Sequence, residues 1–168
     1  VPPLHHHPGD RLSPGIAHQD LKPSNVLVFD NSDSKVADLG CAAYFGHLGP
    51  SDDFPCAGDP SYAPPELQYG HIEPDWKARR LGCDIFLLGS MVVFLFTGLS
   101  VTSMLKNQLH SSHVWGMWAG SYEDVLPYVR NAFGEVVEQF AAAMSNTRLR
   151  EELRTIVSEL CDPDPRRR

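Results

Sequence analysis

The fold of this chain is decided by one short stretch, HQDLKPSN at residues 18–25. It places a carboxylate (Asp20), an ammonium (Lys22) and an amide (Asn25) within six residues of one another. Asp20 can accept a hydrogen bond from an attacking hydroxyl, Lys22 can meet charge on a transferred phosphate, and Asn25 offers an oxygen ligand to a hard cation such as magnesium. The combination is suited to orienting a hydroxyl nucleophile beside a phosphoryl group and its metal.

The octet resembles the catalytic loop of eukaryotic-type protein kinases, His-Arg-Asp-Leu-Lys-Pro-x-Asn, with Gln19 in place of the arginine. At average residue usage, six fixed matches would arise by chance in a chain this long roughly once in 10^5 sequences. Lys22, two residues after Asp20, is the serine/threonine-kinase pattern. The resemblance therefore implies a serine/threonine protein kinase, which transfers the γ-phosphate of ATP to a protein hydroxyl with the help of Mg²⁺.

The resemblance also implies roles for single residues. Asp20 and Lys22 would be catalytic, Asp20 by orienting the acceptor hydroxyl and Lys22 by steadying the phosphoryl group. Lys22, Asn25 and Asp38 would bind the cofactors ATP and Mg²⁺, with Asn25 and Asp38 as the metal ligands. Asp38 opens Asp-Leu-Gly, which resembles the family's Asp-Phe-Gly magnesium triplet. His18 and Gly40 are expected to support this site structurally.

Residues 58–66, GDPSYAPPE, resemble the segment that closes the kinase activation loop, usually Gly-Thr-Pro-x-Tyr-x-Ala-Pro-Glu. Asp59 stands where serine/threonine kinases commonly carry a threonine that contacts the catalytic aspartate and lysine. A carboxylate there would repel Asp20 or attract Lys22, which weakens the implication of a peptide substrate. Gln19 has no charge with which to meet a phosphate, so we do not expect activation-loop phosphorylation to be the on-switch.

Two later segments also match the family. Residues 84–89, DIFLLG, resemble Asp-x-Trp-Ser-x-Gly at the start of the central helix, where the aspartate, here Asp84, braces the catalytic loop. Residues 164–168, DPRRR, resemble Asp-Pro-x-x-Arg. This implies that Arg168 forms a buried ion pair with Glu66, and breaking such a pair is costly because one charge is left alone.

The expected fold is mainly α with a small β-hairpin, like the C-terminal lobe of a protein kinase and lacking the N-terminal β lobe. Residues 1–15, with four prolines and two glycines, predict an irregular segment ahead of the lobe at 16–168. Residues 26–29 and 35–39 predict a hairpin with Asn25 and Asp38 at its ends, and residues 40–66 predict one long loop.

Further along, apolar residues recur at helical spacing from Phe133 to Met144 and from Leu149 to Leu160, and Pro163 follows the second helix. Nothing before the octet resembles a glycine-rich phosphate loop, a strand lysine or its partner glutamate. The family's last helix is also expected to be missing. We therefore expect a fragment of a longer gene or a gene that has lost its first half, inactive alone, with a separate or lost N-terminal lobe.

The composition of the chain argues against some classes of partner and favours one cellular location. A net charge of −7 argues against a nucleic-acid partner, because phosphate contacts need basic patches. The four cysteines form no Cys-x-x-Cys pair, and no secretory signal is visible, so a cytoplasmic location is expected. The expected partners are ATP and a protein substrate.

Three alternatives remain open. The chain could be a non-catalytic, pseudokinase-like scaffold or binding module. The uncharged run from Ile85 to Leu105 is long enough to span a bilayer, although its glycines and hydroxyl residues favour a buried helix that is hydrophobic all round. The aromatic residues Trp115 and Trp118, with Tyr122 and Tyr128, could form a substrate-docking surface or simply pack in the core.

Overall fold

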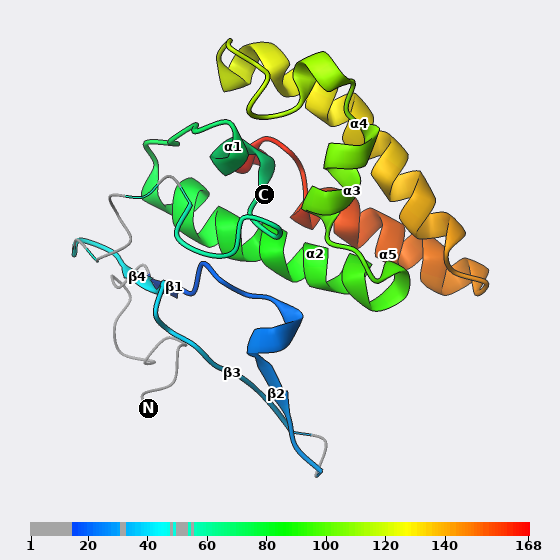
Figure 1. Ribbon diagram of the computed structural model, residues 1–168. Helices are drawn as coiled ribbons and strands as arrows, with labels where there is room; N and C mark the ends of the chain where they lie inside the picture. The colour runs from blue at the N-terminus through cyan, green and yellow to red at the C-terminus, as the bar shows by residue number, and fades with distance from the viewer. Residues whose placement is uncertain (1–14, 31–32, 48, 50–53, 55) are drawn as a thin grey trace.

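The structure is a computed structural model that describes residues 15–30, 33–47, 49, 54 and 56–168. Within these ranges the chain is mainly helical and carries two small antiparallel sheets of two strands each (Figure 1). The expected fold class, a kinase-like C-terminal lobe, is confirmed. The predicted irregular segment 1–15 lies, apart from Gly15, outside the described residues, as does the turn at 31–32.

The predicted hairpin after the octet is present. Strands β2 (Val26–Val28) and β3 (Ser34–Val36) pair antiparallel, with Val26 opposite Val36. The Ala37 N–H also donates to the Asn25 carbonyl at 2.8 Å, which closes the hairpin at its open end. The octet and the residue before Asp38 are therefore joined through the backbone.

A second ladder was not predicted. Strand β1 (Ile16–Ala17) precedes the octet and pairs with β4 (Ala43–Tyr44), which lies inside the stretch predicted as one long loop. Strands of two residues are too short to show a hydrophobic period, so the sequence pattern could not reveal them. The loop prediction also runs too far, because helix α1 (Pro65–Gln68) begins at Pro65.

Four longer helices form the body of the molecule (Figure 1). They are α2 (Gly82–Thr97), α3 (Val101–Gln108), α4 (Tyr122–Ala142) and α5 (Thr147–Leu160). Helix α3 packs on α4, and α5 packs on both α2 and α4. Their facing sides bury an apolar core that includes Phe86, Val93, Leu105, Val125, Val136, Phe140 and Val157. Short turns complete the chain: 3₁₀ turns at Pro23–Asn25, Ser111–His113 and Pro165–Arg167, and a π-helical turn at Lys77–Leu81.

The helix predicted from Phe133 onward is the second half of α4. The helix begins earlier, at Tyr122, where the Ser121 hydroxyl accepts the Asp124 N–H at 3.2 Å. Val125 and Val129 are fully buried one turn apart, so the apolar face continues into this first half. Pro127 lies inside the helix and removes one N–H donor. Sequence patterns treat a proline at such a position as a helix break.

The uncharged run at 85–105 does not form one continuous helix. Helix α2 ends at Thr97 because Gly98 adopts a left-handed conformation with φ of 74°, and the Ser100 hydroxyl then caps α3. A single span from Ile85 to Leu105 is therefore excluded. One helical segment, Lys77–Thr97, is long and apolar enough to cross a membrane, with 44% of its apolar window buried in the fold. The expected buried helix is present only in part, because Phe86 and Val93 are fully buried but Leu95 is 76% exposed.

Candidate active site

The backbone of the octet is fixed by one carboxylate of helix α2. Asp84 accepts the N–H of His18 at 2.6 Å through Oδ2 and the N–H of Gln19 at 2.7 Å through Oδ1. Gln19 has φ of 64°, a left-handed conformation that costs energy for a residue with a side chain and persists only where its surroundings hold it. Burial raises the pKa of Asp84, although the two N–H donors favour its charged form. The brace predicted for Asp84 is thus present.

His18 connects the octet to the end of the hairpin. Its Nε2 lies 3.0 Å from the Ala37 carbonyl, and its Nδ1 lies 3.3 Å from the Asp20 N–H. A carbonyl can only accept and an N–H can only donate, so both bonds are satisfied by a neutral ring protonated at Nε2. His18 therefore fixes the backbone of Asp20 relative to the residue that precedes Asp38.

Three donors converge on the buried carboxylate of Asp20. Oδ1 accepts the Asp59 N–H at 2.8 Å. Oδ2 accepts Asn25 Nδ2 at 3.0 Å and lies 3.1 Å from Lys22 Nζ. A carboxylate has about four positions for accepted hydrogen bonds, so the described contacts leave roughly one for an incoming hydroxyl. The carboxylate is held in one orientation, which is what a group that positions a nucleophile requires.

Asp59 contacts both predicted catalytic residues. Of the two outcomes considered for its carboxylate, attraction is the one observed: Oδ2 lies 3.4 Å from Lys22 Nζ. Burial acts to raise the pKa of Asp59, but hydrogen bonds from Ser61 and the Lys22 charge outweigh it and lower the pKa. Desolvation acts to lower the pKa of Lys22, but Asp20 and Asp59 outweigh it and raise the pKa.

Gly58 makes this close approach possible, a role that sequence reasoning missed. A Cβ atom at Gly58 would lie 2.4 Å from the Gln19 carbonyl oxygen and 2.8 Å from Asp20 Oδ1. No side chain fits at such distances without displacing the backbone. The sequence did contain a signal, since Gly58 matches the first position of the activation-loop segment.

The two predicted metal ligands lie at the open end of the hairpin. Asn25 is buried and its Nδ2 also donates to the Asp20 carbonyl at 2.8 Å, so Oδ1 is the atom available to a cation. Asp38 is exposed, has φ of 64°, and accepts the Gly40 N–H at 3.2 Å. The two side chains form no hydrogen bond with each other in the described part of the chain. An amide oxygen and a carboxylate are oxygen ligands of the kind that Mg²⁺ prefers, so the donor set fits this metal.

The predicted ion pair between Glu66 and Arg168 is present. Arg168 Nη2 lies 2.6 Å from Glu66 Oε2, and both side chains are almost completely buried. Arg168 also donates to the Gly82 carbonyl at 3.1 Å, and its guanidinium lies 5.2 Å from the centre of the Phe86 ring. Burial raises the pKa of Glu66, and the adjacent guanidinium opposes that rise. The pair ties α1 to the start of α2 and to the segment after α5.

The side chain of Gln19 has partners that sequence reasoning missed. Its Nε2 donates to the Cys41 carbonyl at 2.8 Å, and its Oε1 accepts a hydrogen bond from Arg80. Arg80 lies in the π-helical turn just before α2 and is only 3% exposed. A glutamine therefore links the octet to α2 through a buried arginine. The sequence signal was weak, since Arg79 and Arg80 resemble an ordinary solvated pair ahead of an apolar helix.

Comparison with known proteins agrees with this geometry. The family model for the protein kinase domain matches residues 10–168. The chain is 37% identical over 86 residues, 51% of its length, to mitogen-activated protein kinase kinase kinase 18 of Arabidopsis thaliana. It is 44% identical over 85 residues, 48% of its length, to serine/threonine-protein kinase chk1 of Schizosaccharomyces pombe.

A longer match reaches 130 residues, 74% of this chain, at 31% identity to the G-type lectin S-receptor-like serine/threonine-protein kinase SD1-1 of Arabidopsis thaliana. The chain spans 23%, 16% and 15% of the lengths of these three relatives. With the family match covering nearly the whole sequence and the Asp20, Asp84 and Glu66 contacts in place, the chain belongs to the protein kinase family.

Proposed function

We propose that the chain is the catalytic lobe of a serine/threonine protein kinase, which transfers the γ-phosphate of ATP to a protein hydroxyl. The observation that carries this proposal is the convergence of Lys22, Asn25 and the Asp59 N–H on the Asp20 carboxylate at 2.8 to 3.1 Å. Asp20 would accept the hydrogen bond of the acceptor hydroxyl at its remaining position. Lys22, beside it, would face the charge of the phosphoryl group.

The cofactor side of the proposal rests on Asn25 and Asp38, which would hold Mg²⁺, and on Lys22, which would contact the phosphate. Bound Mg²⁺ would neutralise charge on the phosphates of ATP. The Ala37 N–H bond to the Asn25 carbonyl and the His18 bond to the Ala37 carbonyl keep the two metal ligands in a fixed backbone relation. Magnesium and the acceptor would thus be handled from one rigid loop and the hairpin that follows it.

We further propose that these 168 residues need a nucleotide-binding lobe in order to act. Exposed apolar side chains of the β2–β3 hairpin support this proposal, since folded proteins usually bury such side chains. Val28 is 77% exposed. Leu27, Phe29 and Val36 are exposed beside it. Contiguous apolar surface of this kind is typical of an interface with another part of a protein.

A non-catalytic scaffold is the second candidate, and one contact favours it. The Asp59 carboxylate already pairs with Lys22, the cation that would otherwise meet the phosphoryl group. A kinase-like lobe whose lysine stays paired in this way could bind partners without transferring phosphate. The Asp20 cluster favours the enzyme, because a scaffold has no need of a carboxylate held by three donors.

Thermal unfolding and phosphoryl transfer distinguish the candidates. A ligand raises Tm only if it binds the folded form. Because the proposal assigns ATP binding largely to a nucleotide-binding lobe, the 168-residue chain alone should show little or no rise in Tm with Mg²⁺ and ATP. Fusion of a serine/threonine kinase nucleotide lobe ahead of residue 16 should give both a rise in Tm and phosphorylation of a serine-containing protein.

The matched variants are Asp20→Asn and Asp38→Asn in the fusion protein. Asp20→Asn should abolish transfer while the nucleotide-dependent rise in Tm persists, and Asp38→Asn should weaken the Mg²⁺ dependence of that rise. A fusion that binds Mg²⁺ and ATP but transfers no phosphate would support the scaffold instead. Transfer that is unaffected by Asp20→Asn would refute the proposed role of that carboxylate.

A cytoplasmic location stays a prediction, and neither nucleic acid nor a membrane is part of the proposal.

A further inference from the structure

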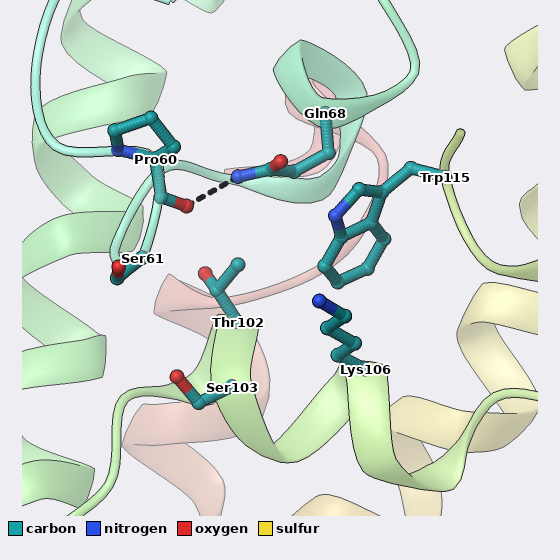
Figure 2. A pocket seen from close by; sticks show the side chains of 7 residues that line it. All are labelled: Pro60, Ser61, Gln68, Thr102, Ser103, Lys106 and Trp115. Carbon is teal, nitrogen blue, oxygen red and sulfur yellow. Dashed lines mark hydrogen bonds between the residues drawn. The ribbon is translucent and has the colours of Figure 1, made fainter.

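A separate cavity of about 220 Å³ lies between the segment that follows Asp59 and the first two turns of α3 (Figure 2). Residues from three parts of the chain line it: Pro60, Ser61, Gln68, Thr102, Ser103, Lys106 and Trp115. Figure 2 shows the Lys106 side chain extending from α3 to the ring of Trp115, with Gln68 and Pro60 on the other side. None of the proposed catalytic or metal-binding residues belongs to this lining.

Two hydrogen-bond donors in the lining have no acceptor among the described residues. Within the part of the chain that the structure describes, neither Lys106 Nζ nor Trp115 Nε1 forms a hydrogen bond or ion pair, and no Asp or Glu belongs to the lining. Two backbone acceptors of the wall are already engaged: the Pro60 carbonyl accepts from Gln68, and the Ser61 carbonyl accepts from Ser100. A site with an ammonium and an indole N–H but no carboxylate is complementary to an anion.

Trp115 also gives the cavity a rigid apolar wall. Its ring packs edge-on against Tyr69, with centroids 6.0 Å apart, and the Tyr69 hydroxyl in turn donates to the His113 carbonyl. An aromatic wall held in this way buries the aliphatic part of a ligand while the Nε1–H remains free to donate. The ligand that fits best is therefore a side chain with an apolar stem and an anionic end.

The cavity begins close to the proposed phosphoryl-transfer site. Asp59, whose N–H donates to Asp20 and whose carboxylate faces Lys22, also accepts the Ser61 N–H at 2.9 Å. Two residues of extended chain span at most about 7 Å, so the Ser61 wall lies within that distance of Asp59. A polypeptide whose hydroxyl reaches Asp20 could therefore place a neighbouring side chain in the cavity.

We propose that this cavity is a subsite for an anionic side chain of the acceptor polypeptide, with its carboxylate or phosphoryl group bound by Lys106 Nζ and Trp115 Nε1–H. The inference rests on the proposed function, because it takes the acceptor to be a polypeptide. It adds a preference: acceptor sequences with a glutamate or a phosphorylated residue near the phosphorylated hydroxyl.

The indole N–H signals of the ¹⁵N-labelled 168-residue chain provide a direct test by NMR. The probes are heptapeptides Ala-Ala-Ser-Ala-X-Ala-Ala in which X is glutamate, phosphoserine or glutamine, together with inorganic phosphate. The Trp115 signal, assigned with Trp115→Phe, should move with the glutamate peptide, the phosphoserine peptide or both. The Trp118 signal serves as an internal control, because its Nε1 already donates to the Ser121 carbonyl at 3.0 Å.

Lys106→Gln should weaken binding of the anionic peptide by ~10-fold or more, since it removes the charged donor. Lys77→Gln, an exposed lysine outside the cavity, should leave it unchanged. The peptide that shifts the Trp115 indole signal shows whether the cavity binds a carboxylate or a phosphoryl group. Equal movement with the glutamine peptide, movement with inorganic phosphate alone, or no movement would each overturn the proposal.

Failure of the inference and failure of the proposed function give different results. If the fusion protein transfers phosphate but treats the glutamate and glutamine peptides alike, the subsite is wrong and the kinase assignment stands. If Lys106-dependent peptide binding occurs but no fusion protein transfers phosphate, the cavity binds anionic side chains, and both the proposed catalytic function and the role of the cavity as an acceptor subsite are wrong.

Discussion

The ammonium of Lys22 lies 3.4 Å from the carboxylate of Asp59. The same Asp59 donates its N–H to Asp20 at 2.8 Å, so one residue contacts both members of the proposed catalytic pair. Lys22, which is proposed to face the phosphoryl group, is therefore already paired with an anion of the chain itself. An incoming phosphate would have to compete with Asp59 for Lys22, and the strength of this pair sets how much that competition costs.

Asp59→Asn should lower the pKa of Lys22, because the raised value depends on nearby negative charge. Asparagine keeps the size of the side chain and the oxygen that accepts the Ser61 N–H, so only the charge is removed. The free energy of unfolding should change by less than ~1 kcal/mol, as is usual for partly exposed pairs. The pKa can be followed by NMR titration of ¹³C-labelled lysine.

The matched control is Asp75→Asn. Asp75 also accepts a backbone N–H, from Ala78 at 2.8 Å, and it forms no pair with Lys22. This variant should leave the Lys22 pKa unchanged. A Lys22 pKa that is the same in Asp59→Asn and in the parent chain would show that the ion pair does not form in solution.

Glu66→Gln should reduce the free energy of unfolding by about 3–5 kcal/mol, because it leaves the Arg168 guanidinium buried without its counter-charge. Urea unfolding followed by circular dichroism measures the change. The Gly82 carbonyl still accepts from Arg168, but one neutral acceptor does not replace a carboxylate at 2.6 Å.

The double variant Glu66→Gln/Arg168→Met separates the ion pair from simple loss of packing. Removing both charges should recover part of the stability lost in Glu66→Gln, since no unpaired charge then remains buried. Additive losses from the two single variants would indicate that the side chains do not interact. The comparison uses the parent chain, the single variants Glu66→Gln and Arg168→Met, and the double variant, each followed through a single unfolding transition.

Contacts tied to motif positions could be predicted from the sequence. The Asp84 brace and the Glu66–Arg168 pair follow from residue types at fixed places in the kinase pattern, and the structure forms both. The β2–β3 hairpin was predictable because two β-type runs flank turn residues. In each case, the information lies in a local pattern or in a resemblance that covers the residues concerned.

Other contacts depend on tertiary structure that no local pattern encodes. The bond between Gln19 and Arg80 joins residues 61 positions apart, and the β1–β4 ladder uses strands of two residues. Hydropathy predicted one long apolar run at 85–105, but the left-handed conformation of Gly98 divides it. The Trp115 cavity could not be predicted from the sequence for the same reason, because its lining comes from three separate segments.

Gly89→Ala should destabilise the chain by about 1–3 kcal/mol through overpacking where α2 meets the end of α5. A Cβ atom there would lie 2.4 Å from Cys161 Sγ and 2.9 Å from Leu160 Cβ. Gly134→Ala is the matched control: Gly134 is an exposed position inside α4 with no atom within 4 Å of an added Cβ. It should stabilise the chain by up to ~1 kcal/mol, because alanine favours the helix.

Thermal or urea unfolding of both variants measures the two effects. The double variant Gly89→Ala/Cys161→Ala should recover some of the lost stability, since the nearest atom to the new methyl group is the Cys161 sulfur. If Gly89→Ala stabilises the chain as Gly134→Ala does, the two helices are not in close contact at this position.

The four cysteines should separate into two classes when a thiol reagent is added at pH 8. Cys83 and Cys161 are buried, and burial raises the pKa of Cys161 to about 12, so only about one Cys161 thiol in 10^4 is ionised at that pH. Cys41 and Cys56 are only partly buried and should react in the native protein. A Cys161 thiol held neutral by the fold contributes stability at pH 8 that is lost as the pH rises from 9 towards 12. Two reactive thiols before denaturation and four after it are expected, with Cys161→Ala lowering only the second number. Rapid labelling of Cys161 in the folded chain would mean that the end of α5 separates from α2 in solution.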